Sequence, residues 1–318
     1  MLYLLILFVV AVVVASCTGS SLVTHTGTDM RYDYCAPPVA YTATYWPLTN
    51  LDSLMQADIV ITRQLSAHDL LMANALGIAP IVAQLVRLSA DTSAAASLQR
   101  TRLGNRVQNR LLLAASEIDG IAAELDCEGE RSEQLAHYLD NLNTRRNNRL
   151  TAASIIIGAA ITVATAATSN SDAQNAIGIS GGLVTAGLGA MMLNPPGKKI
   201  EMNFSRRNIL HDIWYTPPAS AIYTPFVWYM LNEKQFSNSH QVSLAQNIRL
   251  RWTNFEFGGK LNPLREKLFF DAGGTYTAED LHTRAALLNQ LQSTLRSVHQ
   301  DMQVFHAAVS KFYLEPLH

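Results

Sequence analysis

The chain has 318 residues, of which 48% are hydrophobic and only 15% carry a charged side chain. Soluble domains usually have about 25% charged residues, so this composition favours extensive helix packing or closeness to a membrane. The formal net charge is −1, which leaves no basic field to hold DNA or RNA, and we expect no nucleic-acid partner. The length allows one large domain or two of ordinary size.

The chain opens with an apolar segment that ends at a cysteine. Residues 2–15 are apolar except for Tyr3, and Val-Ala-Ser at positions 14–16 precedes Cys17. About fourteen apolar residues are too few to span a bilayer comfortably, but they have the length of a signal-peptide core. This order of residues resembles the lipobox of bacterial lipoproteins, in which the signal is removed and the cysteine thiol is diacylated.

The lipobox resemblance covers residues 1–17, and no family is recognised for the mature chain. It implies a signal peptide at residues 1–16 and a palmitate-type acyl anchor on Cys17 that holds the chain to membrane lipid. Thr18 is not the aspartate of an inner-membrane retention signal, which implies an envelope protein of the outer membrane that faces the periplasm. An uncleaved anchor is the alternative, because no Lys or Arg precedes the apolar run.

Cys35 and Cys127 are the two remaining cysteines. Once Cys17 is acylated, they form an even pair in a compartment that permits disulfides. A bridge between them closes a loop of about 90 residues, worth about 4 kcal/mol in the chain-entropy model, and two free thiols are the alternative. Neither cysteine has the spacing of a metal or redox motif.

Residues 17–50 are predicted to form a lipidated tether, because they are rich in Ser, Thr, Gly and Pro. Residues 51–150 carry hydrophobic side chains at helical spacing and are predicted to form a helical bundle. Its first helix runs to about Leu76, where Gly77 and Pro80 interrupt the pattern.

Two longer helices are predicted in the second half of this bundle. One has a hydrophobic stripe from Leu103 to Leu125, and the other begins near Arg131 and continues to Leu150. Cys127–Glu130 contains a glycine among polar residues and is predicted to form the turn between them. The two helices are expected to pack antiparallel.

Residues 151–193 are almost free of charge. Between Arg149 and Lys198 the only ionisable side chain is that of Asp172. The segment 169–172 has turn and N-cap chemistry, so the two apolar arms on either side are predicted to form a helical hairpin. Each arm is about 27–32 Å long, close to the thickness of the hydrocarbon layer of a bilayer.

Small residues recur every four positions in this hairpin. Gly178, Gly182, Ala186 and Ala190 form such a stripe on the second arm, and Gly158 begins one on the first. Stripes of this kind let helix backbones approach closely, as they do where helices associate in lipid. Three interpretations stay open: a membrane-inserted or oligomerising hairpin, a hairpin buried in the core of the protein, and a flexible Ala/Gly-rich loop.

Residues 200–275 hold most of the aromatic side chains and are predicted to form a small aromatic-rich α/β region. Ile248, Leu250 and Trp252 alternate with two arginines, and this two-residue period predicts a half-buried strand. The tryptophans of the region suit either stacking on a cell-wall sugar or packing in a core, and core packing is the commoner role.

Residues 277–315 are predicted to form one long helix. Thr277 and Asp280 have the spacing of a capping box at its start. A heptad seam then runs from Leu288 to Phe312, which must pack against another helix of the chain or of a second copy. Packing within the chain is preferred, because other long helices are predicted.

No HExxH, GxSxG, P-loop or GxGxxG motif occurs in the sequence. His68-Asp69 and His211-Asp212 are adjacent residues, whose side chains point in different directions on a helix, so neither pair predicts a catalytic dyad. We therefore assign no catalytic residue, no metal site and no cofactor from the sequence.

The sequence predicts a mainly α protein: a long antiparallel helical bundle with a Gly/Ala-rich hydrophobic hairpin and minor β structure in an aromatic-rich region. We expect a non-enzymatic envelope lipoprotein with a structural or assembly role in a multiprotein complex of the secretion or export type. Its expected partners are membrane lipid, other envelope proteins and a second copy of the chain. The alternatives are a cell-wall enzyme with a site in residues 200–275 and a pore-forming protein that uses the 151–193 hairpin.

Overall fold

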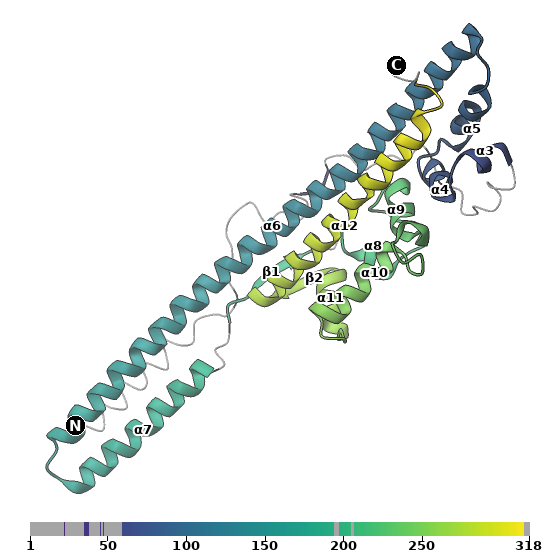
Figure 1. Ribbon diagram of the computed structural model, residues 1–318. Helices are drawn as coiled ribbons and strands as arrows, with labels where there is room; N and C mark the ends of the chain where they lie inside the picture. The colour runs from purple at the N-terminus through teal and green to yellow at the C-terminus, as the bar shows by residue number, and fades with distance from the viewer. Residues whose placement is uncertain are drawn as a thin grey trace. The chain divides into compact units, whose positions relative to one another are not determined.

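The computed structural model describes residues 22, 35–37, 45, 47, 59–193, 197–204 and 207–314 of the chain. The predicted signal peptide, Cys17 and most of the predicted tether lie outside these residues. Within the described part the protein is mainly α-helical, as predicted, with one two-stranded sheet (Figure 1).

The chain divides into two compact units. One, called the hairpin unit, comprises Met1–Met30, Ser132–Met202 and Gly274–His282. The other, called the core unit, comprises Arg31–Arg131, Asn203–Gly273 and Thr283–His318.

Three short helices begin the described part of the core unit: α3 (Ile59–Gln64), α4 (Ala67–Ala75) and α5 (Ala79–Leu88). The helix predicted up to Leu76 is broken before Ser66, whose hydroxyl accepts a hydrogen bond from the Asp69 N–H at 3.1 Å. The Asp69 carboxylate accepts from the Ser66 N–H in return, and this capping box starts a new helix. The interruption predicted at Gly77 is present, with a φ of 72° that favours glycine.

Helix α6 (Ala94–Ala167) is one uninterrupted helix of 74 residues. The turn predicted at Cys127–Glu130 is therefore wrong, and so is the antiparallel pair of helices predicted around it. Gly129 lies inside the helix, where an added Cβ would come within 3.0 Å of the Asn289 side chain. The glycine that suggested a turn instead allows helix α12 to approach α6 closely.

Helix α12 (Ala278–Ser310) packs against α6 in the core unit and runs in the opposite direction. The Gln292 amide donates hydrogen bonds to the Ala122 carbonyl at 3.2 Å and to the Asp126 carboxylate at 2.8 Å. Farther along, an added Cβ on Gly104 would meet the ring of Tyr313. The predicted heptad seam is buried within the chain, which confirms the intramolecular packing: Leu288, Leu291, Leu295, Val298, Met302, Phe305, Val309 and Phe312.

The capping box predicted at the start of α12 is also present. The Thr277 hydroxyl accepts from the Asp280 N–H at 3.1 Å, and the Asp280 carboxylate accepts from the Thr277 N–H at the same distance. This reciprocal pair fixes the first turn of the helix, as its sequence spacing indicates.

The aromatic-rich part of the core unit consists of short helices joined by turns. These are α8 (His211–Tyr215), α9 (Pro225–Asn232), η1 (Lys234–Phe236), α10 (Leu244–Arg251), η2 (Trp252–Glu256) and α11 (Pro263–Phe270). The strand predicted at Ile248–Trp252 is therefore wrong. Residues four apart share a helix face, so Ile248 and Trp252 are both buried in a helix while Leu250 between them is exposed.

The helix changes type after Trp252. The Phe257 N–H donates to the Trp252 carbonyl at 3.1 Å, five residues back, which is the hydrogen bond of a π-helix. The extra residue rotates the chain so that Phe255 is exposed whereas Phe257 is buried.

The tryptophans of this region pack in a core. Trp228 and Trp252 are buried, and Trp214 stacks on Phe270 with ring centroids 4.2 Å apart. The guanidinium of Arg249 lies 5.5 Å from the centroid of the Trp214 ring. These contacts show that the tryptophans of this region pack in a core, which is the commoner of the two roles considered in the sequence analysis.

Buried charge also lies in the core unit. Arg207 donates to both carboxylate oxygens of Glu124, at 2.6 and 2.8 Å, and the Glu124 side chain is only 4% exposed. The buried guanidinium of Arg284 donates to the Phe269 carbonyl at 3.2 Å and lies 3.8 Å from the centroid of the Phe204 ring. The bidentate pair of Arg207 and Glu124 is strong because both partners are charged and two hydrogen bonds fix their orientation.

The sheet pairs β1 (Ile200–Asn203) with β2 (Gly273–Tyr276) in antiparallel orientation. Neither strand was predicted, since four residues are too few to establish a two-residue period. β2 ends just before the capping box of α12, so the sheet leads the chain into that helix.

Candidate functional sites in the hairpin unit

The predicted helical hairpin is formed by the C-terminal part of α6 and by α7 (Ser171–Leu193) (Figure 1). At its tip the Asn170 side chain accepts from the Asp172 N–H at 2.9 Å, which caps α7. At its base the Lys198 N–H donates to the Asn143 side chain at 2.7 Å and ties the returning chain to α6. Both ends of the hairpin are therefore fixed by side-chain hydrogen bonds.

The two arms touch along a narrow inner face. Ile177 on α7 is 8% exposed, and it is the one large hydrophobic side chain of residues 151–187 in the buried class. One turn farther along α7, an added Cβ on Gly181 would lie 2.6 Å from the Ile161 side chain. The close approach of the arms thus depends on Gly181, which was not in the predicted stripe.

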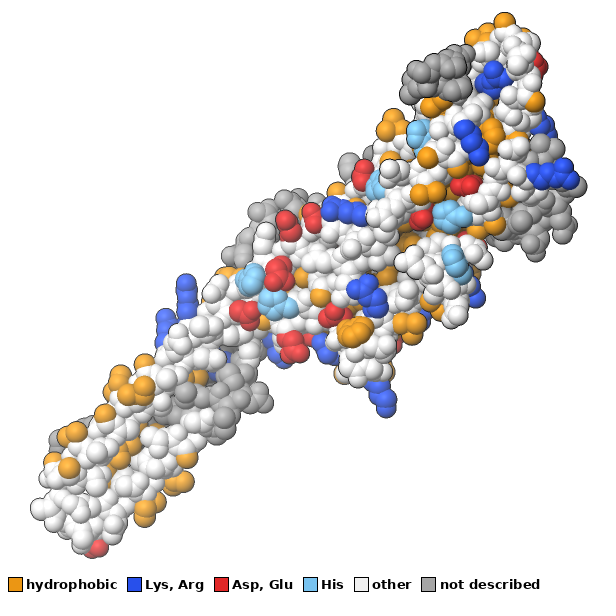
Figure 2. Space-filling model, viewed as in Figure 1, with side chains coloured by type: hydrophobic (Ala, Val, Ile, Leu, Met, Phe, Trp, Pro, Cys, Tyr) orange, Lys and Arg blue, Asp and Glu red, His pale blue; other side chains and the backbone are white. Residues whose placement is uncertain are grey.

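The outer faces of both arms are hydrophobic and exposed. Large side chains on them are between 65% and 70% exposed: Ile155, Ile156, Val163, Ile179 and Leu183. Figure 2 shows hydrophobic side chains distributed over this part of the surface. Both arms are helical, which speaks against the loop alternative, and the described residues do not bury the arms as a core hairpin would require.

Helix α6 is, among the described residues, the one helix long and apolar enough to cross a membrane by length and composition. Its apolar 18-residue window has a mean hydropathy of 2.0, and only 6% of that window is buried. A core helix of a soluble protein reaches such hydropathy only when it is mostly buried. Among the described residues, the chain itself therefore covers little of this apolar window.

Basic side chains lie at the base of the hairpin. Arg145 and Arg149 on α6 are exposed, as is Lys199 just after the second arm. At the opposite end, Asp172 is the only charged side chain of residues 150–197. The arrangement places cations where the apolar arms begin, as at the edge of a membrane-embedded segment.

The predicted small-residue stripe faces away from the contact between the arms. A Cβ added at Gly158, Gly178 or Gly182 would meet nothing within 4 Å, and Ala186 is exposed. The side chain of Ala190 lies outside the described residues. The described part of the stripe is thus on the outer surface.

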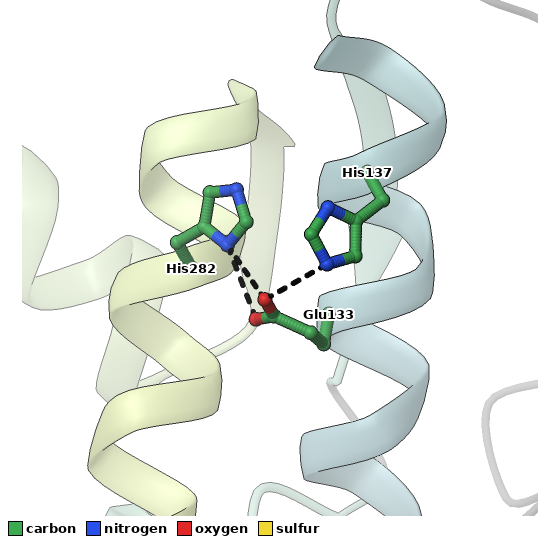
Figure 3. A group of neighbouring side chains, drawn as sticks. All are labelled: Glu133, His137 and His282. Atoms are coloured by element: carbon green, nitrogen blue, oxygen red, sulfur yellow. Dashed lines mark hydrogen bonds and ion pairs between the residues drawn. The ribbon is translucent and has the colours of Figure 1, made fainter. Parts of the chain in front are cut away.

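A second site joins α6 to the first turn of α12 within the hairpin unit. Glu133 lies between the imidazoles of His137 and His282 (Figure 3). Its carboxylate oxygens are both 3.1 Å from His282 Nδ1, and one of them is 3.2 Å from His137 Nε2. One ligand atom from each residue can be chosen so that all three lie within 4.8 Å of one another.

Asp140 completes this cluster from the same helix. Its carboxylate lies 2.9 Å from His282 Nε2, so both ring nitrogens of His282 face carboxylates. The hydrogen bond to Asp140 is the largest cause that raises the pKa of His282 above 6.5, and partial burial opposes it. The hydrogen bonds and charges of Glu133 and Asp140 raise the pKa further.

The sequence did not reveal this cluster. Glu133 and His282 are 149 positions apart, so only the packing of two helices brings them together. The available signal was the four-residue spacing of Glu133 and His137, which places both on one helix face but occurs often without a ligand.

Of the two histidines followed by an aspartate, one contacts that neighbour and the other pairs with a distant aspartate. His211 Nδ1 lies 2.9 Å from the Asp212 carboxylate, so the expectation that adjacent side chains diverge is wrong for this pair. The other Asp212 oxygen accepts from the Ser220 hydroxyl at 2.5 Å. A nucleophile needs the imidazole next to its hydroxyl, whereas here the carboxylate lies between the two groups. His68 instead pairs with Asp301 at 3.4 Å, as the divergence of adjacent side chains predicts.

The cysteines of the core unit are joined. Cys35 and Cys127 form a disulfide with their Cα atoms 5.7 Å apart, so of the two alternatives the bridge is the one present. It attaches the described residues around Cys35 to the middle of α6. The role predicted for Cys17 concerns a residue outside the described part.

Comparisons of the chain with known protein families, with curated proteins and with solved structures find no match.

Proposed function

We propose that this protein is a bacterial envelope lipoprotein attached to the membrane at two points, by an acylated Cys17 and by the hairpin of α6 and α7. The observation that carries the proposal is the exposed apolar outer face of the hairpin, with 6% of its most apolar window buried. The hairpin reaches into the hydrocarbon layer, and its basic base lies at the lipid headgroups.

The energetic case depends on a small number of large side chains. Fully burying one Ile, Leu or Val side chain stabilises by about 1.5–3 kcal/mol, whereas Ala, Gly and Thr gain little. Because these side chains are between 65% and 70% exposed, covering the five of them with lipid supplies about two thirds of that amount each, on the order of 5–10 kcal/mol together. Exposed cations at the base add attraction to anionic headgroups of about 1 kcal/mol each.

The role proposed for the core unit is structural: it takes part in a multiprotein complex of the secretion or export type. Support comes from the tryptophans in the described residues 207–314, which stack on other aromatic rings of the chain instead of presenting their faces to a sugar. The outward-facing glycines of the hairpin suit close packing with a second copy or another membrane helix.

The proposal is tested by removing the acyl anchor while the hairpin stays. The chain from Thr18 onward is exported behind a signal peptide that is fully cleaved, and membranes are washed with alkaline carbonate. We expect a large share of this chain to stay in the membrane fraction. Replacing Ile156 and Leu183 by Glu should release it, because each change places a charge on an outer face that is at least 67% exposed.

A matched control separates insertion of the hairpin from nonspecific membrane binding by exposed hydrophobic side chains. Leu112 and Leu264 are also exposed, at 69% and 82%, but lie in the core unit. Their replacement by Glu should leave the chain in the membrane fraction. If the chain without the acyl anchor is found wholly in the soluble fraction, the hairpin is not a membrane contact. The first anchor is tested separately: an acyl label should be incorporated into the wild type but not into Cys17→Ser.

A further inference from the structure

We propose that Glu133, His137 and His282 bind one divalent transition-metal ion, with Zn²⁺ as the expected occupant, and that Asp140 is a positioning residue for His282. The site lies wholly in the hairpin unit and does not depend on the proposed membrane attachment. It departs from the sequence analysis, which assigned no metal site.

The spacing of the donor atoms fits a zinc site. Zn²⁺ binds imidazole nitrogen and carboxylate oxygen at about 2.0–2.2 Å in tetrahedral geometry, so ligand atoms lie about 3.3–3.5 Å apart. The Glu133 oxygens are 3.1 Å from His282 Nδ1 and 3.2 Å from His137 Nε2. The largest separation among the three donors is below 4.8 Å and closes by small side-chain rotations.

The contact with Asp140 directs the donor nitrogen of His282. When the Nε2–H of the neutral imidazole donates a hydrogen bond to Asp140, at 2.9 Å, the lone pair is on Nδ1, which faces Glu133. Metal-binding histidines commonly donate a hydrogen bond from their second ring N–H to a carboxylate, which orients the ring and raises the basicity of the metal-binding nitrogen. His282 therefore has both the nitrogen and the partner that a ligand histidine needs.

The donor set selects the class of ion. Two imidazoles and one carboxylate suit Zn²⁺ and its neighbours in the first transition row, whereas Ca²⁺ and Mg²⁺ prefer oxygen ligands alone. His137 and Glu133 are 65% and 44% exposed, so an ion can enter from solvent and keep water as a fourth ligand. In the absence of an ion, hydrogen bonds and ion pairs hold the same groups together, and the experiment must separate these two states.

The test uses the full-length chain, purified in detergent and stripped of metal with a chelator, then titrated with Zn²⁺. We expect one tight site and a higher melting temperature with Zn²⁺ bound. Tetrahedral Co²⁺ should give the visible absorption of a mixed nitrogen and oxygen set. His137→Ala and His282→Ala should lose the tight site, the shift in melting temperature and the absorption.

His299→Ala is the matched control. His299 also lies on α12 beside a carboxylate of α6, with its Nε2 3.1 Å from Asp119, but it has no second histidine in this arrangement. It should bind Zn²⁺ as the wild type does. Asp140→Asn keeps all three ligands and should weaken binding by about 10–100-fold.

Several results would overturn the proposal. Equal Zn²⁺ affinity in the wild type, His137→Ala and His282→Ala would place any bound ion elsewhere. The absence of tight binding in the wild type would leave the cluster as a network of hydrogen bonds and ion pairs without a metal. Wild-type affinity in Asp140→Asn would remove its positioning role. Circular dichroism of the metal-free proteins checks folding, and Glu133→Gln, which keeps the size of the side chain, is used if a histidine variant does not fold.

Discussion

The hairpin unit and the core unit use hydrophobic residues in opposite ways. In the core unit the heptad seam of α12 and aromatic rings such as those of Trp252 and Phe270 are buried, and charged groups such as Glu124 are paired inside. In the hairpin, large side chains such as Ile156 and Leu183 face outward, and the described inner face consists of little more than Ile161, Ile177 and Gly181.

This difference shows where the stability of each unit comes from. A packed interior stabilises the core unit by itself, because removing one buried partner leaves its neighbours without contacts or hydrogen bonds. The hairpin has helical hydrogen bonds but little interior, so an external apolar environment supplies what its own packing lacks. Substitutions that are costly in one unit should therefore be nearly neutral in the other.

The largest difference is expected for the buried ion pair. Arg207→Met leaves the Glu124 carboxylate buried without its cation and should lower the free energy of unfolding by about 3–5 kcal/mol. Leu183→Ser on the outer face of the hairpin, at 70% exposure, should change the free energy of unfolding of the core unit, which its tryptophans report, by less than about 0.5 kcal/mol. Urea unfolding in detergent, followed by the fluorescence of the buried tryptophans, measures both.

The double variant Glu124→Gln/Arg207→Met is the control for this prediction. It removes the buried charge that Arg207→Met leaves alone, so it should be more stable than Arg207→Met. Additive losses from the two substitutions would show that the pair does not act as a unit, and would place the stability of this region in packing instead.

Sequence periodicity predicted the parts of the fold in which one helix face is buried over many turns. The seam from Leu288 to Phe312 and the stripe from Leu103 to Leu125 are of this kind, and both are buried. The strand predicted at Ile248–Trp252 failed because positions 248 and 252 agree with a two-residue period and with a helical one. Only Leu250, exposed between them, distinguishes the two.

Features that depend on contacts between residues far apart in the chain could not be predicted from the sequence. Gly129 resembles a turn residue until Asn289 is seen against it, and a sequence gives no register between two helices. The cluster around Glu133 needs the same register to bring His282 into place. The hairpin was easier to predict because an uncharged segment of bilayer length, with turn residues in its middle, is a local property.

A smaller effect is expected from two adjacent glycines of α7. Gly181→Ala and Gly182→Ala both gain about 1 kcal/mol of helix propensity, so a comparison of the two isolates contact with the other arm. The Cβ added at Gly181 lies 2.6 Å from Ile161, whereas the one at Gly182 meets nothing within 4 Å. Overpacking at Gly181 should destabilise the hairpin by about 1–3 kcal/mol relative to Gly182→Ala.

Amide hydrogen exchange of peptides from the two arms, in detergent, measures this difference. Exchange in the Gly181→Ala hairpin should be about 5- to 100-fold faster than in Gly182→Ala. Equal exchange in the two variants would show that the arms do not pack on this face, and the contrast with the closely packed core unit would then be larger than the structure indicates.

The smallest predicted effect concerns the pH dependence of the core unit. The hydrogen bond to Asp301 is the largest cause that raises the pKa of His68 above 6.5; burial opposes it, and the charges of Asp301 and Asp69 add to it. A raised pKa in the folded state means that protonated His68 stabilises the fold below pH 6.5, and that this contribution is lost as the pH rises through the folded-state pKa. Because both side chains are about 30% exposed, the contribution should be about 0.5 kcal/mol.

Unfolding free energies at pH 5.5 and pH 8.5 test this contribution. The decrease between these values should be smaller in His68→Gln than in the wild type by that amount. Asp301→Asn should remove the same part of the decrease, because it removes the other partner of the pair, and the double variant should add nothing further. His282 also has a raised pKa and supplies pH dependence of the same sign, so only the difference between variants measures His68. If His68→Gln and the wild type follow parallel curves, the contact with Asp301 does not hold a proton, and His68 acts only through its edge-on packing against Phe236, 5.1 Å between ring centroids.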